Sequence, residues 1–599
     1  MNAMNEATLE CIQAINSRSE SANSISFGAN CQQVMDIGFF FDGISRNLTD
    51  DALTDKFSNV AAMFESHLRE QDDHLGNAFR KHYYSGLGTS FESSLSDDVV
   101  GAANRVPGEA VGTGEGQLRS SGTDAAKEVL SGGGSGRWYE VFGRSFKVSI
   151  TQPWNWVKAA RDAAIRTGIE AAAPIRDTSI AANLLMSGSH TRLSSAVRDF
   201  HNSVADVKQN SELPLAKIRV SVFGFDFGAA MAKAFVRRLL EEVCDQDGER
   251  FVYQDSDVEM VFVGLLDCVD RTHAEMGLLD WFHPLSPVLD DGGELHPGCQ
   301  RALHLVAAHE RRFYRRCRPL GGQNSQWHEE LCPGISEDIG GGLKADEQKA
   351  SAELSRAALH RMYRRATIAG VPFPPLDSLA TRGRRFAQMF ELNDEIEGYS
   401  LPTLARHYQR LTDSRQRPSD ENFRSHTLVY LAWLAQRYRD YQDTLAALEA
   451  REDELPNRYY HRTIGSLVAS VSGSQEEWSI QTAERAEIDE ALSTLKQAWG
   501  WLEDVDSEAK DIRSRMMSSG NTGAHARATL RHHFQLASSW YQWTREESPP
   551  ELPEPVGLLF AYGLHDKQPE EMTYRNRQPS QLVGGYRFMT WRGIDQPEG

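Results

Sequence analysis

Apolar and polar positions alternate in blocks over the first 270 residues, and these blocks predict strands that are followed by helices. Val34 to Phe41 is an almost continuous apolar run closed by Asp42-Gly43, which predicts a buried strand that ends in a turn. Ile218 to Phe223 and Met260 to Leu266 are two further runs of strand length. Ala229 to Phe235 follows the first of these two after a short turn and has the composition of a helix. This order favours a mostly parallel sheet with helices on both faces.

Weaker patterns predict further elements between and after these strands. We expect a helix over Ser58–Gln71 and a second strand and turn over His82–Thr89. The spacing becomes helical after about residue 345, as in His426–Tyr438 and Ile488–Leu502. Proline and glutamate between 549 and 555 indicate a linker, followed by a short β-like tail over Val556–Gly563 and Gly584–Trp591.

These patterns divide the chain into four parts. Residues 1–30 form a polar tail, residues 31–345 an α/β core, residues 346–548 a helical region, and residues 549–599 a linker with a short β-like tail. A large insert interrupts the core at about 90–210, because its first part holds ten glycines between Gly101 and Arg137, which raise the entropy cost of ordering. For the Ala-rich segment at 152–210, a packed helix and a lid or membrane-facing helix are the two alternatives.

Composition excludes several classes of protein. The 599 residues carry 64 basic and 84 acidic side chains, a formal charge of −20, which disfavours general nucleic-acid binding. The 7 cysteines include no CxxC pair, so neither a disulfide framework nor a cysteine zinc site is indicated, and reduced thiols fit a bacterial-type cytosol. We expect no transmembrane helix and no cleavable signal peptide.

The turn after Ile218–Phe223 has the layout of a nucleophile elbow. Gly224, Gly228 and the alanines after them are small enough for a sharp strand-to-helix turn, with Phe227 directly after the central residue. That central residue is Asp226, where a serine hydrolase has serine. Asp226 is therefore a carboxylate nucleophile, a degenerate position in a protein without catalysis, or a plain helix N-cap.

Several blocks resemble, in order, the first class of type VI secretion lipase effectors, bacterial α/β-hydrolase phospholipases delivered into competitors. The opening block is Phe41-Asp42-Gly43 with Asn47, although Ile44 replaces the usual threonine. The others are Tyr83–Thr89, Phe223–Ala230, Gly264–Val269, His304–Arg312, Pro333–Gly342, His565-Asp566 and Gly585-Tyr586. The resemblance spans about residues 34–592. It implies an α/β-hydrolase-like fold with a mostly parallel sheet, a large insert and an added C-terminal helical region.

The same resemblance implies the position of a catalytic triad. By position, the nucleophile, acid and base become Asp226, Asp267 and Ser336, with Gly224, Phe227 and Gly228 around the oxyanion site. Only the acid is retained, because Asp226 is no serine and Ser336 cannot act as a base. His309, which stands where the family has an aspartate, is a substitute base in one interpretation. His304 and His328 are further candidates, and ordinary structural histidines are the plainer interpretation of all three.

Three other groups have a functional and a structural interpretation. Arg311, Arg312, Arg315, Arg316 and Arg318 form either a solvated or salt-bridged helix or a contact with lipid phosphates. Gly340–Gly342 is either a structural turn or an anion-binding loop. Asp42, Asp226, Asp267 and Asp338 could converge on Ca²⁺ or Mg²⁺, yet we expect no metal and no cofactor.

Three functions remain open at this stage. The chain is a lipase effector acting on membrane phospholipid, a pseudoenzyme that binds lipid or a partner protein, or a hydrolase with Asp226 as its nucleophile. The resemblance implies a secretion spike and an immunity protein as partners, and export from the bacterial cytoplasm by a type VI route without a signal peptide. Because two of three triad positions are changed, we expect little or no serine-type esterase activity.

Overall fold

A computed structural model describes the chain in seven ranges with short internal gaps. These ranges are 32–87, 179–269, 292–412, 417–454, 475–519, 530–566 and 586–594. The glycine-rich part of the expected insert and residues 1–30 lie outside the described residues. Among the described residues, no helix is both long and apolar enough to cross a bilayer.

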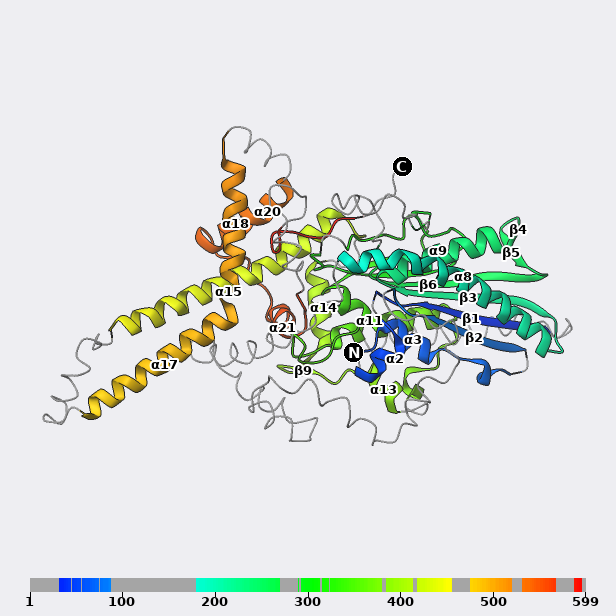
Figure 1. Ribbon diagram of the computed structural model, residues 1–599, viewed down its shortest axis with the longest axis horizontal. Coiled ribbons are helices and arrows are strands. Elements are labelled where there is room, and N and C mark those ends of the chain that lie inside the picture. Colours follow the sequence, from blue (N-terminus) through cyan, green and yellow to red (C-terminus); the bar gives the residue numbers. More distant parts are fainter. Residues whose placement is uncertain are drawn as a thin grey trace.

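Among the described residues, the centre of the molecule is an eight-stranded, mostly parallel sheet, as the apolar runs predicted (Figure 1). Six strands are parallel, in the order β2 (Asn77–Tyr84), β1 (Gln33–Phe41), β3 (Leu215–Phe225), β6 (Ser256–Leu266), β7 (Ala302–Ala307) and β8 (Trp327–Cys332). A hairpin of β4 (Asp245–Asp247) and β5 (Arg250–Tyr253) pairs antiparallel with the first half of β6. The carboxyl ends of the parallel strands therefore form one edge of the sheet, called here the strand-end edge.

Helices cover both faces of the sheet because side chains of β1 alternate between them. Phe39 packs on Phe235 of α9 (Phe227–Arg238), and α8 (Ser179–Asn210) covers the same face. Phe40 points the other way, onto Phe64 of α3 (Asn59–Ser66). That second face is completed by α11 (Glu353–Ile368) and α13 (Arg384–Phe390).

Two of these helices lie where the sequence placed other parts. α8 falls inside the expected insert, and α11 begins beyond residue 345, the expected end of the core. Both pack against the sheet through buried apolar side chains, such as Phe200 of α8 and Leu359 of α11. The division into four parts remains a prediction, but these two helices belong to the layers around the sheet.

The C-terminal half adds helices, as expected. They are α14 (Leu401–Thr412), α15 (Asp420–Glu454), α17 (Gln475–Trp499), α18 (Leu502–Met517), α20 (Arg531–Arg545) and α21 (Glu554–Tyr562). Five of them share one apolar core, while the far half of α15 pairs with α17 in an arm that extends away from the sheet (Figure 1). Minor elements are α2 (Leu48–Thr54), α10 (Ser336–Gly340), β9 (Glu395–Ile396), β10 (Tyr399–Ser400) and short turns at 70–72, 239–243 and 376–378.

The expected β-like tail is wrong in the described residues, since residues 554–562 are helical and residues 586–591 contain no strand. Residues 554–562 form helix α21, because the apolar run Val556–Tyr562 follows a proline cap and buries Val556, Leu559 and Phe560 among the other helices. The run over Ile488–Leu502 is also divided, since α17 ends at Trp499 and α18 starts at Leu502. Apolar periodicity alone did not separate a short buried helix from a strand.

The last described segment of the chain connects the C-terminal helices to the sheet. Residues 586–594, called here the C-terminal strap, start at α18, where Glu508 accepts the backbone amides of Arg587, Phe588 and Met589 at 2.7–2.9 Å. The strap then reaches the loop after β7, where the amide of Arg592 donates to the carbonyl of Glu310 and Cys317 donates to Gly593. This path brings Arg592 to the strand-end edge of the sheet.

Candidate functional site

Asp226 occupies a tight, strained turn at the strand-end edge, between β3 and α9. Its backbone angles are φ 54° and ψ −126°, a conformation that costs a non-glycine residue free energy. The amide of Asp226 donates to Leu266 at 3.0 Å, and its carbonyl accepts from Ala229 and Val269. The predicted elbow geometry is therefore present at Asp226.

The two glycines of the turn are required by close backbone approach. A Cβ on Gly228 would lie 2.4 Å from the carbonyl oxygen of Asp42, and a Cβ on Gly224 would lie 2.5 Å from the Cα of Ala229. Phe227, the first residue of α9, is buried. The small residues of the pattern thus let α9 start directly against the ends of β1 and β3.

The carboxylate of Asp226 is buried and faces an arginine. Its side chain is 3% exposed, and Oδ1 lies 4.0 Å from Nη1 of Arg315. Arg315 also lies 3.7 Å from Glu337, and Arg312 bridges Glu337 and Glu310 with hydrogen bonds of 2.6–3.1 Å. Positive and negative groups thus alternate from Asp226 to Glu310 in one buried ion-pair chain.

Asp267 follows β6, the neighbour of β3, and is fully buried against the C-terminal strap. Its two oxygens lie 2.7 and 2.9 Å from Nη1 of Arg592, and Oδ1 accepts the amide of Ala307 at 2.9 Å. Burial alone would raise the pKa of Asp267, but the Arg592 guanidinium and the amide of Ala307 hold it below its usual value. An arginine therefore occupies the partner position of this carboxylate.

Ser336 starts the short helix α10 and is completely buried. Its amide donates to Glu310 at 3.3 Å, and its hydroxyl lies beside Asp267. The three positions carried over from the family triad therefore lie at one edge of the sheet, with Asp226 and Asp267 linked to arginines. Their catalytic role remains a prediction.

His309 lies on the loop after β7, and both of its ring nitrogens have partners. Nδ1 accepts the amide of Gly334 at 3.0 Å, so Nε2 carries the proton and donates to Tyr408 of α14 at 3.1 Å. Burial, helped by His426 and Arg311, lowers the pKa of His309 well below its usual value. This neutral ring connects the loop to the helical region.

The other two candidate histidines, His304 and His328, lie on strands β7 and β8. His304 in β7 accepts the amide of Cys268 at 2.9 Å and donates to Glu329 at 2.9 Å. His328 in β8 is exposed. The strand assignment follows from the continuous burial of residues 302–307 between two parallel neighbours.

The arginine cluster is buried in a loop and does not form an exposed helix. Arg311, Arg312, Arg315 and Arg318 are each 5% exposed or less, while Arg316 is partly exposed and donates to the carbonyl of Ile594 at 2.8 Å. Arg311 pairs with Asp566 at 3.3 Å, and the pairing of Arg312 and Arg315 with acidic groups is described above. The salt-bridged interpretation holds without the helix, because a lipid phosphate needs arginines at the surface.

The four aspartates proposed as oxygen ligands have separate partners. Asp42 accepts from Ser58, Tyr83 and the amide of Gly43, while Asp338 accepts from His565 and the amide of Ile335. Within the described ranges, no group of three or more His, Cys, Asp or Glu side chains could hold a metal ion. Gly340 packs so closely on Phe225 that a Cβ would lie 1.9 Å from its ring. This close packing supports the interpretation of Gly340–Gly342 as a structural turn.

Sequence reasoning missed Arg592 and the dyad of His565 with Asp338. Nδ1 of His565 lies 2.6 Å from Asp338, and its Nε2 has no hydrogen-bond partner in the described part of the chain. The terminal His565-Asp566 and Gly585-Tyr586 blocks pointed to these segments, but long-range pairs such as Asp267 with Arg592, 325 positions apart, leave no local pattern.

Comparison with known proteins gives a fold but no family. No family model and no curated protein matches the chain. A crystal structure of an uncharacterized protein from Pseudomonas aeruginosa is similar at 16% identity with a TM-score of 0.51, over 99% of this chain and 82% of that one. This likeness indicates a shared fold only.

A second solved structure is the Tle1 effector bound to the VgrG spike of the type VI secretion system. It is similar at 15% identity with a TM-score of 0.37, over 66% of this chain and 83% of that one. A TM-score this low does not establish a common fold, so the fold assignment depends on the first comparison and on the sheet itself.

Proposed function

We propose that this protein is a catalytically inactive α/β-hydrolase-like protein, similar to type VI lipase effectors, that acts by binding and not by ester hydrolysis. The single observation that carries this proposal is the ion pair of Asp267 with Arg592. In a Ser-His-Asp enzyme the acid orients a histidine, and here an arginine that cannot be deprotonated takes that place.

The nucleophile and base positions support the same proposal. A serine hydroxyl attacks only after a base removes its proton, but Asp226 stands at the nucleophile position and the hydroxyl of Ser336 cannot act as a base. Losing members of a triad costs about 10⁴ to 10⁶ in turnover and leaves only the residual rate of the oxyanion site and binding. His309 receives no catalytic role in this proposal, because both of its ring nitrogens are already hydrogen-bonded.

The sequence blocks shared with lipase effectors support a role in type VI secretion. An effector-like protein without hydrolysis would act on membrane phospholipid, a spike protein or an immunity protein through its surface. We place the protein in a bacterial cytoplasm before export by a type VI route.

A second candidate function is hydrolysis with Asp226 as the nucleophile. One observation favours it, because the strained backbone at Asp226 is retained although a relaxed turn would be more stable. Against it, Arg315 and the ion-pair chain hold the carboxylate inside the protein, where it is 3% exposed.

Fatty-acid release from phosphatidylglycerol and phosphatidylethanolamine vesicles separates the two candidates. We expect neither the unchanged protein nor Asp226→Ala to release fatty acid above the protein-free rate. Release by the unchanged protein that disappears in Asp226→Ala would establish the carboxylate nucleophile and refute the inactive assignment. Release that survives this substitution would place the chemistry elsewhere.

A further inference from the structure

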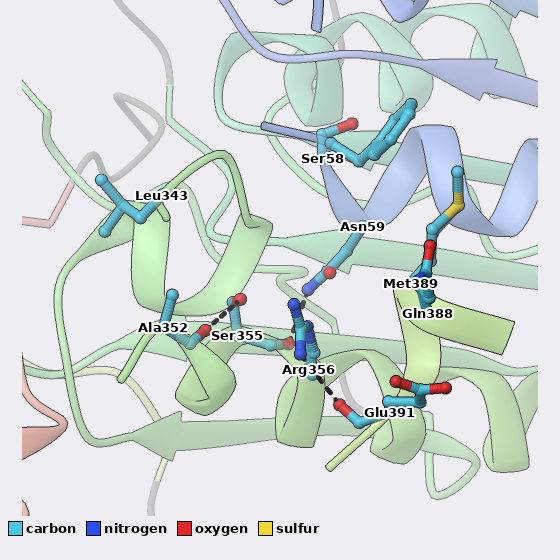
Figure 2. A pocket seen from close by; sticks show the side chains of 11 residues that line it. Ser58, Asn59, Leu343, Ala352, Ser355, Arg356, Gln388, Met389 and Glu391 are labelled. Carbon is cyan, nitrogen blue, oxygen red and sulfur yellow. Dashed lines mark hydrogen bonds between the residues drawn. The ribbon is translucent and has the colours of Figure 1, made fainter. Parts of the chain in front are cut away.

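A cavity of about 350 Å³ lies beside the strand-end edge on the face covered by α3 and α11 (Figure 2). The first turns of these two helices line it together with Gln388 and Met389 of α13. Ser58, which donates to Asp42, is part of the wall. The volume suits a small molecule, and none of the triad positions contributes to the lining.

Asn59 offers one fixed acceptor to this cavity. Its Nδ2 donates to the carbonyl oxygens of Ile339 and Ser355, both at 2.8 Å. Because both partners are acceptors, the amide orientation is determined and Oδ1 is left to accept. The residue is 3% exposed, and no donor to Oδ1 exists among the residues that the structure describes.

Arg356 provides a positive charge on the same wall. Its Nη1 donates to the carbonyl of Glu391 at 3.1 Å and lies 3.4 Å from Glu353, whose carboxylate also accepts the amides of Asn393 and Asp394. Nε and Nη2 have no partner in the described ranges, and the side chain is 38% exposed. The positive ends of the α3 and α11 dipoles lie at the same cavity.

Glu391 adds a negative charge next to Arg356, as Figure 2 shows. One of its carboxylate oxygens accepts from Asn393 at 3.2 Å, and the other has no partner in the described part of the chain. Ala62, Leu343 and Met389 give the cavity an apolar side. A simple anion is disfavoured at this wall, because Glu391 and the buried Glu353, which lies 3.4 Å from Arg356, would both repel it.

We propose that this cavity binds a small zwitterion, a molecule with one phosphate or carboxylate group and one ammonium group on a short apolar body. The anionic group pairs with Nε and Nη2 of Arg356, and the ammonium group donates to Oδ1 of Asn59 and to the carboxylate of Glu391. Free amino acids and ethanolamine phosphate share this chemistry, and the latter also occurs as a lipid head group. The inference is independent of the proposed function, because it uses none of the triad positions.

Titration calorimetry of the full chain tests the proposal with O-phosphoethanolamine and L-leucine as zwitterions. Inorganic phosphate and ethylammonium are the probes with a single charged group. At least one zwitterion should bind about tenfold more tightly than either single-charge probe, a difference of about 1.4 kcal/mol. Equal binding of a single-charge probe, or no binding of either zwitterion, would overturn the proposal.

Three variants make the assignment specific. Arg356→Gln should weaken binding about tenfold, while Arg361→Gln on the same helix should leave it unchanged, because Arg361 pairs with Glu330 and is comparably exposed at 40%. Ala62→Leu should abolish binding by filling the cavity without a change of charge. Equal loss in both arginine variants would contradict the site.

Sedimentation with vesicles distinguishes the two sources of the zwitterion. Binding to phosphatidylethanolamine vesicles that depends on Arg356, and not to phosphatidylglycerol vesicles, would identify a lipid head group. Binding of only the free zwitterions would identify a soluble ligand. Binding to both kinds of vesicle irrespective of Arg356 would contradict recognition by this cavity.

Discussion

Two buried aspartates follow strands at the same edge of the sheet, and their surroundings are opposite. Asp42 after β1 accepts from neutral donors, the hydroxyls of Ser58 and Tyr83 and the amide of Gly43. Asp267 after β6 accepts from the cation of Arg592. Burial therefore raises the pKa of Asp42 despite its donors, while Arg592 outweighs burial and lowers the pKa of Asp267.

The difference shows that the two carboxylates have different structural roles. The donors to Asp42 are neutral groups, the amide of the next residue Gly43 and the hydroxyls of Ser58 and Tyr83, and they fix the turn after β1. The partner of Asp267 instead arrives from the C-terminal strap, which also connects to α18 through Glu508. At Asp267 a permanent positive charge from the strap pairs with the carboxylate, so this ion pair connects the C-terminal helices to the sheet.

Breaking the ion pair at Asp267 should have the largest effect. Arg592→Met leaves a buried carboxylate without its cation, and we expect a loss of about 3–5 kcal/mol in the free energy of unfolding. The double variant with Asp267→Asn should recover much of this loss, since no charge then remains buried. Urea unfolding followed by circular dichroism measures both values, and a loss below about 1 kcal/mol in Arg592→Met would contradict the structural role of this pair.

Removing one neutral donor at Asp42 should cost less. Ser58→Ala deletes the 2.6 Å hydrogen bond to Asp42 and the cap that accepts the amide of Ala61 at 3.0 Å. We expect a loss of about 1–2 kcal/mol in the free energy of unfolding. Tyr83→Phe removes only one donor to the same oxygen and should cost less than Ser58→Ala in the same urea experiment. The reverse order would show that the cap contributes nothing.

The contributions of Asp42 and Asp267 to stability should change with pH in opposite directions. This is the smallest of the expected effects. Asp267 has a lowered pKa when folded, so its contribution is complete above the ordinary value of 3.8 and is lost as the pH falls through the folded pKa. Asp42 has a raised pKa, so its contribution is complete below 3.8 and is lost as the pH rises through the folded pKa.

Melting temperatures between acid and neutral pH measure this difference. Asp267→Asn should make the acid-side fall in stability shallower than in the unchanged protein, whereas Asp42→Asn should make it steeper. His190→Gln, an exposed position on α8, is the control that should change neither slope. Equal slopes in the two aspartate variants would show that their environments do not differ as described.

The sequence predicted the parts of the site that depend on local pattern. Apolar runs placed β1, β3 and β6, and the spacing of Gly224 and Gly228 placed the turn at Asp226, because a sharp turn constrains residues that are close in the chain. The burial of the arginine loop and the identity of α21 were not predictable from pattern, since both depend on contacts with distant segments. Arg592 is the clearest case, because nothing near it in sequence marks Asp267 as its partner.

The most direct test of the central claim is fatty-acid release from phospholipid vesicles by the unchanged protein and by the double variant Asp226→Ser with Ser336→His. We expect both to release fatty acid no faster than protein-free vesicles, because Arg592 still pairs with Asp267 when the serine and histidine are introduced. Release by the unchanged protein, or release by the double variant while Arg592 is present, would contradict the proposal that the ion pair of Asp267 with Arg592 keeps this site inactive.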